Sequence, residues 1–493
     1  MRYSLFPLAL ASVLVAAPLL PLGAQSGAFL DGRWEGSMNL GDGTEPLVLR
    51  IFPADPQAGQ AEGGLVDLPA RKLFGYPMDG LERVPEGLIF SFLDGAPFAG
   101  RFELGGAPVP VAPGQSLMVT GFASILPAGG GADSRARGLG PFTLSYSGHA
   151  SRGADFGRDV GVDTGRGILP GSLLLPVAAS DRAVPAVLLL SGADADRDGN
   201  NYAVPGRSDA LAQLARALRD RGLASLRFDQ RGSGEAYRLG VDEEKLRFDD
   251  RVADARAAIA SLAGDRRFSR LVILGYSEGA LVGAAALGPG SPVSNRVVGI
   301  VALCASGKTE LETIEEALSS TPEEYKSEAE AIMSALEAGE SYPNPSPYFA
   351  DFFRPSIQAY LASRLGYDVR AAFAAAGLSP ILPREALVIA GGSDLQVSRG
   401  ESESLASARP GTAYRVIPGM SHALKEVGDD EDANYASFTD PSLPLAEGLV
   451  DLVAAFVDGE ALPGSDAFAP GGAAGSGEAG AQGPEGAGEG PPR

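Results

Sequence analysis

The sequence predicts an α/β fold, with a mainly parallel sheet covered by helices on both faces, plus a small N-terminal all-β domain. Beyond residue 155, apolar runs of strand length alternate with amphipathic segments of helix length, a pattern typical of a parallel sheet between two helical layers. From residue 29 to 150, short alternating runs are separated by glycine, proline and aspartate turns instead. A chain of 493 residues, 45% of them hydrophobic, is long enough to bury more than one core.

The segment 29–150 is expected to form a β-sandwich or a β-barrel. Runs such as Leu47–Ile51 and Gly100–Leu104 alternate apolar and polar residues, and no segment of helix length shows helical periodicity. His149, near the end of this segment, has no neighbouring histidine, cysteine or carboxylate cluster, so we expect it to be a surface or structural residue.

The segment 155–460 carries the elements of the α/β domain. Leu211, Leu214 and Leu218 form one stripe of a helix that Gly222 ends. Expected strands lie at 187–190, 224–228, 271–274, 297–303, 387–390 and 414–417, and further helices around 252–262 and at 445–457.

A long insertion, residues 307–383, separates two of these strands. Its first half is predicted to be helical and is rich in glutamate, and its second half carries a group of aromatic residues between positions 348 and 360. Long excursions from a compact sheet are usually functional, so we expect a lid that disfavours anionic substrates. The aromatic side chains either line a substrate cleft or simply pack the insertion onto the domain. They are Tyr348, Phe349, Phe352, Phe353 and Tyr360.

The two ends of the chain have distinct compositions. Residues 1–24 combine Arg2, an apolar stretch from Leu5 to Leu22 and a small-residue end, the pattern of a secretory signal peptide; an uncleaved membrane anchor is the alternative. We therefore expect a periplasmic or secreted protein, with no stable membrane partner after cleavage. Residues 463–493 are rich in glycine, alanine, proline and glutamate, and a disordered tail is expected there.

The composition excludes several classes of function. A net charge of −22 without a basic run argues against a nucleic-acid partner. With two histidines and one cysteine, no metal site or cofactor is predicted. Cys304 can form no intramolecular disulfide, and because no histidine or charged residue adjoins it in the sequence, we expect a small buried hydrophobe.

A candidate nucleophile lies in the run Gly275–Gly279, which reads Gly-Tyr-Ser-Glu-Gly. An apolar strand precedes this run and a small-residue helix follows it, so Ser277 occupies a sharp strand-to-helix turn. Such a turn strains the serine backbone to expose its hydroxyl, and glycines two residues away on each side avoid collisions.

A serine hydroxyl requires a base, and the base requires an acid that orients it. His422 follows the expected strand 414–417, and Asp394 follows the strand 387–390, so both lie at the carboxyl edge of the sheet. The chain order is Ser277, Asp394, His422. Asp229 competes as the acid, but it precedes the serine and adjoins a glycine turn that indicates structural support.

Two backbone N–H groups are expected to form the oxyanion hole. One belongs to Glu278, the residue after the nucleophile, and the other to Ala193, in the loop after the strand 187–190. That loop, Ser191–Asn201, is rich in aspartate and asparagine. Calcium binding is an alternative, although the spacing differs from that of an EF-hand.

Five motifs in this order resemble bacterial α/β-hydrolases near the serine aminopeptidase-like, or hydrolase-4, branch. The loop Ser191–Asn201 resembles the family's G-S-G-P-x-D-R-D-G-N, and Phe228–Gly234 resembles D-x-R-G-x-G. The remaining matches are Gly275–Gly279 with G-H-S-E-G, Ser393–Val397 with a D-L-Q-V turn, and Met420–Lys425 with M-N-H-V-L-K. This chain departs from the pattern at Ala193, Ala195 and Tyr276, which alters the shape of the pocket and removes no catalytic group.

The resemblance implies an α/β-hydrolase fold and hydrolysis through an acyl-serine intermediate, and family members often carry an N-terminal β domain. The expected substrate is a small-molecule ester or amide, and an ester hydrolase is the leading interpretation. A serine peptidase or aminopeptidase-like amidase would use the same residues. A non-catalytic envelope binding protein that retains the fold is an alternative of another class.

Overall fold

The computed structural model describes residues 32–39, 44–52, 54, 61–68, 73–84, 87–95, 98–109, 118–127, 137–148, 157–193, 195–200, 207–239, 241–350, 352–383 and 385–464. The predictions made for residues 1–24, for His149 and for the tail beyond residue 464 lie outside these residues.

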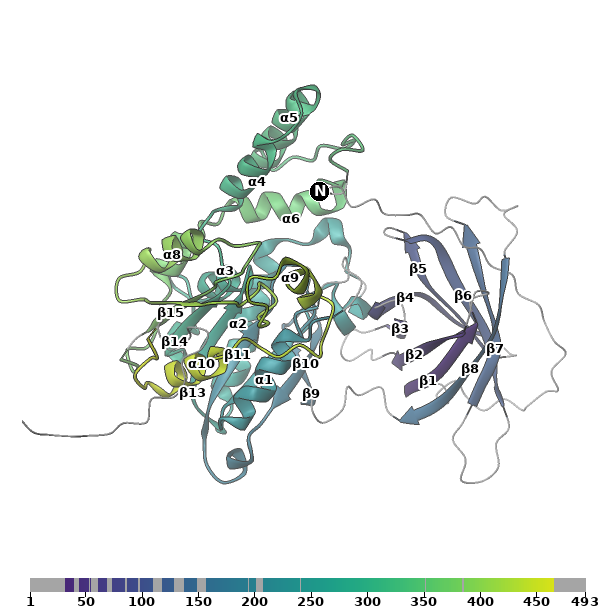
Figure 1. Cartoon of the computed structure of the whole chain (residues 1–493), viewed down its shortest axis with the longest axis horizontal. Coiled ribbons are helices and arrows are strands. Elements are labelled where there is room, and N and C mark those ends of the chain that lie inside the picture. The colour runs from purple at the N-terminus through teal and green to yellow at the C-terminus, as the bar shows by residue number, and fades with distance from the viewer. Residues whose placement is uncertain are drawn as a thin grey trace, which may run out of the picture.

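The N-terminal part is a closed barrel of antiparallel strands (Figure 1). The strands are β1 (Gly32–Asn39), β2 (Thr44–Phe52), β3 (Gly63–Leu68), β4 (Leu73–Val84), β5 (Gly87–Gly95), β6 (Phe98–Val109), β7 (Met118–Pro127) and β8 (Arg137–Gly148). Each pairs with the next, and β1 also pairs with β8, which closes the barrel. Apolar side chains are buried at alternate positions on β2, at Leu47, Leu49 and Ile51, and Trp34 is buried on β1. Of the two architectures expected here, the structure has the barrel.

The second part is built on an eight-stranded sheet in the order β16-β15-β14-β13-β11-β12-β10-β9. The strands are β9 (Arg158–Asp163), β10 (Ile168–Leu174), β11 (Val184–Leu190), β12 (Ala224–Phe228), β13 (Phe268–Tyr276), β14 (Gly299–Leu303), β15 (Ala386–Gly391) and β16 (Ala413–Ile417). Pairing is parallel from β12 to β16, and only β9 and β10 at one edge run antiparallel.

Helices cover both faces of this sheet. They are α1 (Ala210–Asp220), α2 (Phe248–Gly264), α3 (Gly279–Ala286), α8 (Arg399–Ser407), α9 (Glu431–Ser437) and α10 (Leu449–Asp458). One apolar core packs α2 and α3 on the sheet, and a second core packs α1 and α10 on the opposite face. The predicted fold class is therefore confirmed. Among the described residues, no helix has the length and apolar character needed to cross a membrane.

The last helix begins at residue 449, so the prediction of a start at residue 445 is wrong. Leu445 forms an isolated β-bridge with Lys425, which holds this stretch in an extended conformation. Gly448 then takes a left-handed conformation, with φ of 81°, before the helix starts.

The insertion contains α4 (Glu310–Ser319), α5 (Lys326–Glu337), α6 (Pro355–Leu365) and α7 (Val369–Ala375). In Figure 1, α4 and α5 rise away from the sheet, and α6 lies at their base. Phe349 and Phe353 are buried in a small separate core with residues of α4 and α5, so these two aromatics pack the insertion itself. Phe373 on α7 belongs instead to the main core. The second half of the insertion is thus also helical, beyond what was predicted.

A short 3₁₀ segment of the α/β part, η5 (Gly234–Leu239), contacts the barrel. The Tyr237 hydroxyl accepts a hydrogen bond from the Gly64 N–H at 2.5 Å and donates to the Gly64 carbonyl at 2.6 Å. Arg238 Nε donates to the Ala61 carbonyl at 3.1 Å, and the Ala61 N–H donates to the Arg238 carbonyl at 3.0 Å. Four hydrogen bonds therefore join η5 to the start of β3.

Candidate active site

Ser277 lies at the turn between β13 and α3 with a left-handed backbone, φ 53°. A left-handed backbone is strained for a residue other than glycine. This strain is typical of a strand-to-helix turn that exposes a serine hydroxyl at the edge of a sheet. Between residues 271 and 280, only Ser277 is not buried. A Cβ on Gly275 would lie under 3.0 Å from the Ala280 backbone, and one on Gly279 would lie under 3.0 Å from the Leu190 carbonyl. The two glycines therefore make room for the turn.

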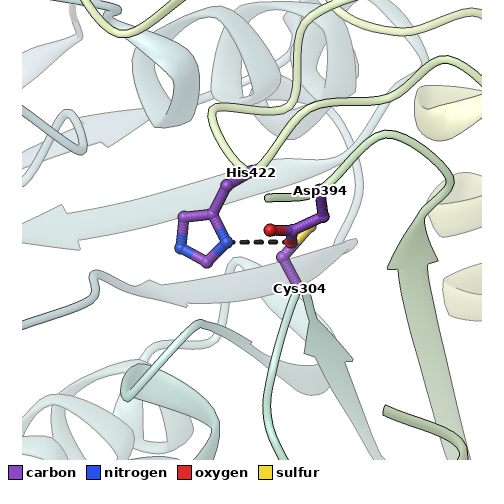
Figure 2. A group of neighbouring side chains, drawn as sticks. All are labelled: Cys304, Asp394 and His422. Carbon is purple, nitrogen blue, oxygen red and sulfur yellow. Dashed lines mark hydrogen bonds and ion pairs between the residues drawn. The ribbon is translucent and has the colours of Figure 1, made fainter. Parts of the chain in front are cut away.

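His422 and Asp394 are joined by a hydrogen bond of 2.9 Å from Nδ1 to Oδ2 (Figure 2). They come from the loops after β16 and β15, and both side chains are buried. The other carboxylate oxygen accepts hydrogen bonds from the N–H groups of Gln396 and Val397, at 2.8 and 2.9 Å. Because an ionised carboxylate only accepts, Nδ1 carries the proton and Nε2 is left as a base.

Tyr276 connects the turn at Ser277 to His422. Its hydroxyl donates to the His422 carbonyl at 2.9 Å, and the two ring centroids are 5.3 Å apart. Burial raises the pKa of this phenol well above its ordinary value, so it stays a neutral donor. Within the described residues, no hydrogen bond joins Ser277 Oγ to the His422 ring. Catalytic hydrogen bonds of this kind often tighten only when a substrate binds.

The loop that carries His422 is held by Lys425. The Ser421 N–H donates to the Lys425 carbonyl at 3.0 Å, and the intervening Leu424 is left-handed, with φ 64°. The Lys425 ammonium is fully buried and donates to Gln213 Oε1 at 2.7 Å and to the Leu443 carbonyl at 2.8 Å. Burial lowers the pKa of Lys425 to about 8. The motif Met420–Lys425 contained this residue without indicating its role.

Cys304 lies directly after β14, beside the Asp394 carboxylate (Figure 2). The expectation that it is buried is correct. No histidine or charged residue adjoins it in the sequence, but the fold brings Asp394 and His422 next to it. Burial raises the pKa of the thiol well above its ordinary value, and the neighbouring carboxylate adds to this. The sulfur therefore stays protonated and faces Asp394 as a donor.

Cys304, Asp394 and His422 form the one group among the described residues whose potential metal-ligand atoms lie together, within 4.8 Å of one another. A metal ion would need a thiolate and a free imidazole nitrogen. The thiol pKa is raised, and Nδ1 already donates to Asp394. The chemistry of these donors fits an orienting acid and a base better than a metal cage.

The loop expected to supply an oxyanion donor lies against Ser277. A Cβ on Gly192 would lie 3.3 Å from Ser277 Cβ and 3.7 Å from Ser277 Oγ. Ala193, the next residue, is exposed. In the part of the chain that the structure describes, the N–H groups of Ala193 and Glu278 donate to no other protein group, which leaves them available to a developing negative charge.

The acidic residues of the same loop are engaged within the protein. Asp196 Oδ1 accepts from the N–H groups of Asp198 and Asn200, at 2.8 and 3.0 Å, and Asp198 pairs with the buried Arg227 at 3.0 Å. These contacts form turns and a buried ion pair, so they do not favour the calcium alternative. Asp229 accepts from the Arg197 N–H at 2.9 Å and pairs with its guanidinium at 3.1 Å, in the supporting role expected for it.

Two further polar residues contact this region and were not singled out from the sequence. Gln230, inside the Phe228–Gly234 motif, donates to the loop Ser191–Ala195, and Arg251 on α2 contacts both that loop and Glu278. A cavity beside them is lined by Leu190, Ser191, Phe228, Gln230, Arg251, Asp254 and Val282. Motif position gave a signal for Gln230, and no pattern indicated Arg251.

Comparison with known proteins places these residues in a family context. A family model described as the alpha/beta hydrolase family matches residues 187–433, half of the chain, and this span includes Ala193, Ser277, Asp394 and His422. No curated protein matches.

Among solved structures, Est1E from Butyrivibrio proteoclasticus with ferulic acid bound is 15% identical, with a TM-score of 0.39 over 60% of this chain and 96% of that chain. The esterase domain of a Rhodothermus marinus protein is 17% identical, with a TM-score of 0.36 over 61% and 98%. The enol-lactonase from Burkholderia xenovorans LB400 is 16% identical, with a TM-score of 0.31 over 50% and 88%.

Proposed function

Because the chain belongs to the alpha/beta hydrolase family, we propose that it is an exported serine hydrolase that cleaves carboxylic esters through an acyl-serine intermediate. Ser277 is the nucleophile, His422 is the general base and Asp394 is the acid that orients His422. The observation that carries this proposal is the His422–Asp394 hydrogen bond of 2.9 Å, together with the φ of 53° at Ser277, whose neighbour Tyr276 donates to the His422 carbonyl. We further place the chain near the serine aminopeptidase-like branch of the family, on the motifs described above.

The reaction follows from the protonation states at the site. His422 Nε2 removes the proton from Ser277 Oγ as the oxygen attacks the ester carbonyl. The N–H groups of Ala193 and Glu278 stabilise the negative charge on the carbonyl oxygen. The protonated imidazole then gives its proton to the leaving alcohol, and water, activated by the same base, releases the acyl group.

Hydrolysis of short nitrophenyl esters tests this proposal. We expect turnover by the wild-type protein and a loss of about 10⁴-fold or more in kcat for Ser277→Ala and for His422→Ala. A fluorophosphonate should modify Ser277 in the wild-type protein. Equal rates in the variants would contradict the mechanism, and folded protein without a Ser277 adduct would favour the non-catalytic alternative.

A substrate panel distinguishes an ester hydrolase from a peptidase-like amidase. Esters and aminoacyl amides of matched acyl groups are compared by kcat/KM, and we expect the esters to be preferred. A preference for the amides would favour the peptidase-like alternative with the same three residues. Export is tested by the N-terminus of the mature protein, which we expect to follow Ala24.

We also propose that the insertion 307–383 is a lid over the site. The contacts that support it come from α6, where Tyr360 donates to Glu278 Oε1 at 3.0 Å and Arg364 pairs with Glu278 Oε2 at 2.9 Å. Glutamates on α4 and α5 should disfavour anionic substrates. Deletion of residues 309–342 is expected to change selectivity between neutral and anionic esters, and unchanged selectivity would refute the lid.

A further inference from the structure

The peptide group between Gly192 and Ala193 is held by hydrogen bonds to its carbonyl oxygen. Its carbonyl oxygen accepts a hydrogen bond from Gln230 Nε2 at 2.6 Å and a longer one from an Arg251 terminal nitrogen at 3.4 Å. A trans peptide is planar, and its carbonyl and N–H point in opposite directions. Fixing the Gly192 carbonyl therefore also fixes the direction of the Ala193 N–H, which points away from Gln230 and Arg251.

Gln230 ties this peptide to the rest of the loop. The same Nε2 also lies 2.9 Å from Ser191 Oγ and 2.8 Å from the Ala195 carbonyl, so it bridges three points of the loop. Gln230 is placed by Asp229, whose N–H donates to the Pro170 carbonyl at 2.9 Å. The loop that faces Ser277 is thus anchored to the end of β12.

Arg251 contacts both segments that carry the expected oxyanion donors. One terminal nitrogen donates to the Ser191 carbonyl at 3.1 Å, and the other pairs with the buried carboxylate of Glu278. Glu278 is the residue whose own N–H is the second expected donor. A planar guanidinium makes such paired contacts with a defined geometry, so a single side chain sets the separation of the two segments.

We propose that Gln230 and Arg251 are positioning residues that aim the Ala193 N–H and fix its distance from the Glu278 N–H, so that both donors meet the oxyanion. In this role the two side chains act through the donors that they hold and not on the reacting atoms themselves. This inference rests on the proposed function, since it assigns a role within the same acyl transfer. The donors gain their full effect only on the charge of the tetrahedral intermediate, so a misaligned N–H lowers kcat more than it changes substrate binding.

The test uses Gln230→Met and Arg251→Met in the full chain, with a short nitrophenyl ester as substrate. We expect kcat to fall about 10- to 100-fold in each variant, while KM changes by less than about twofold. The affinity for an arylboronic acid, which forms a tetrahedral adduct on the serine, should fall by a similar factor. Arg251→Lys should lose less kcat than Arg251→Met, because an ammonium keeps the positive charge but cannot make the paired contacts of a planar guanidinium.

Arg256→Met is the matched control. Arg256 lies on the same helix, α2, and also donates to main-chain carbonyls, those of Ala285 and Ala286, at 3.0 and 3.1 Å. It makes these contacts at the end of α3, away from the loop of Gly192. We expect this variant to keep kcat and boronate affinity within about twofold of the wild type, whatever its effect on the free energy of unfolding.

The possible outcomes separate this inference from the proposed function. If the wild type is active and the folded Gln230→Met variant keeps the same kcat and boronate affinity, the positioning role is overturned. The hydrolase proposal is then unaffected. Equal losses in Arg256→Met would do the same, because the effect would then be general destabilisation. If Arg251→Met does not fold, Gln230→Met alone decides. Wild-type protein without ester turnover or fluorophosphonate labelling overturns both proposals.

Discussion

Lys425 should contribute a stability that increases with pH between about 8 and 10.5, measured as the difference between the wild type and a variant without this amine. Burial lowers the pKa of Lys425 from its ordinary 10.5 to about 8 in the folded chain. In this window the unfolded chain still binds a proton that the folded chain has released, so the free energy of unfolding rises with pH. At about 1.4 kcal/mol per pH unit between the two pKa values, the full gain is about 3.5 kcal/mol, of which about 3 kcal/mol is reached by pH 10.5.

The contacts of the side chain agree with this direction. A neutral amine has two N–H donors, and the Lys425 nitrogen has two acceptors, Gln213 Oε1 and the Leu443 carbonyl. Both remain satisfied after the proton is lost, and the cost of a buried charge disappears. Deprotonation therefore strengthens the loop that carries His422.

Urea unfolding of the wild type and of Lys425→Met at pH 7.5, 9 and 10.5 measures the effect. Groups that titrate in both proteins cancel in the difference between them, so we expect the wild type to gain about 3 kcal/mol relative to the variant across this range. A difference that stays constant with pH would refute the reasoning, because it would mean that the buried nitrogen titrates as it does in water.

Three further predictions follow from the site. Asp394→Asn should lower kcat about 10⁴-fold with little change in KM, because an amide next to His422 reverses the imidazole tautomer; steady-state kinetics on a folded variant check this. Iodoacetamide should leave Cys304 unmodified in native protein at pH 8 and modify it readily in urea, as mass spectrometry would show; equal rates would mean that the thiol is neither buried nor held protonated. Gly279→Ala should lose about 2–3 kcal/mol of stability and most of the activity, because the added Cβ would collide with the Leu190 carbonyl. Gly400→Ala, at an exposed helical position with open space around it, should instead gain about 0.5–1 kcal/mol. Urea unfolding measures both changes.

The strands were predictable because burial on both faces leaves a continuous apolar run. The segment 224–228 coincides with β12 at both ends, and the other predicted parallel strands fall within or close to the observed ones. The helices of the second half of the insertion were not predicted. Predictions for this half rested only on its aromatic residues, and two of these, Phe349 and Phe353, pack in a core within the insertion and not against the sheet.

The order of Ser277, Asp394 and His422 along the chain could be read from motifs, since each lies next to a recognisable strand or turn. Their surroundings could not. Cys304 reaches Asp394, 90 positions further along the chain, only because β14 and β15 are neighbours in the sheet. Arg251 contacts Glu278 through the packing of α2 against α3, which no local pattern encodes. Contacts between residues so far apart in the sequence depend on the order of strands and helices in the fold, which a short motif does not determine.

The junction between the barrel and η5 has a consequence for how this protein is divided. Glu235, in η5, pairs with Arg197 at 2.8 Å and with Arg50 of the barrel at 3.9 Å, and Arg197 in turn pairs with Asp229. These ion pairs connect the barrel to Arg197 and Asp229, which lie next to the loop that faces Ser277. A shortened chain that begins near residue 157 would remove the hydrogen-bond partners of Tyr237 at Gly64 and the contact of Glu235 with Arg50. Glu235 would then be held by Arg197 alone of these two arginines. The two parts are therefore better regarded as one structural unit than as two independent domains.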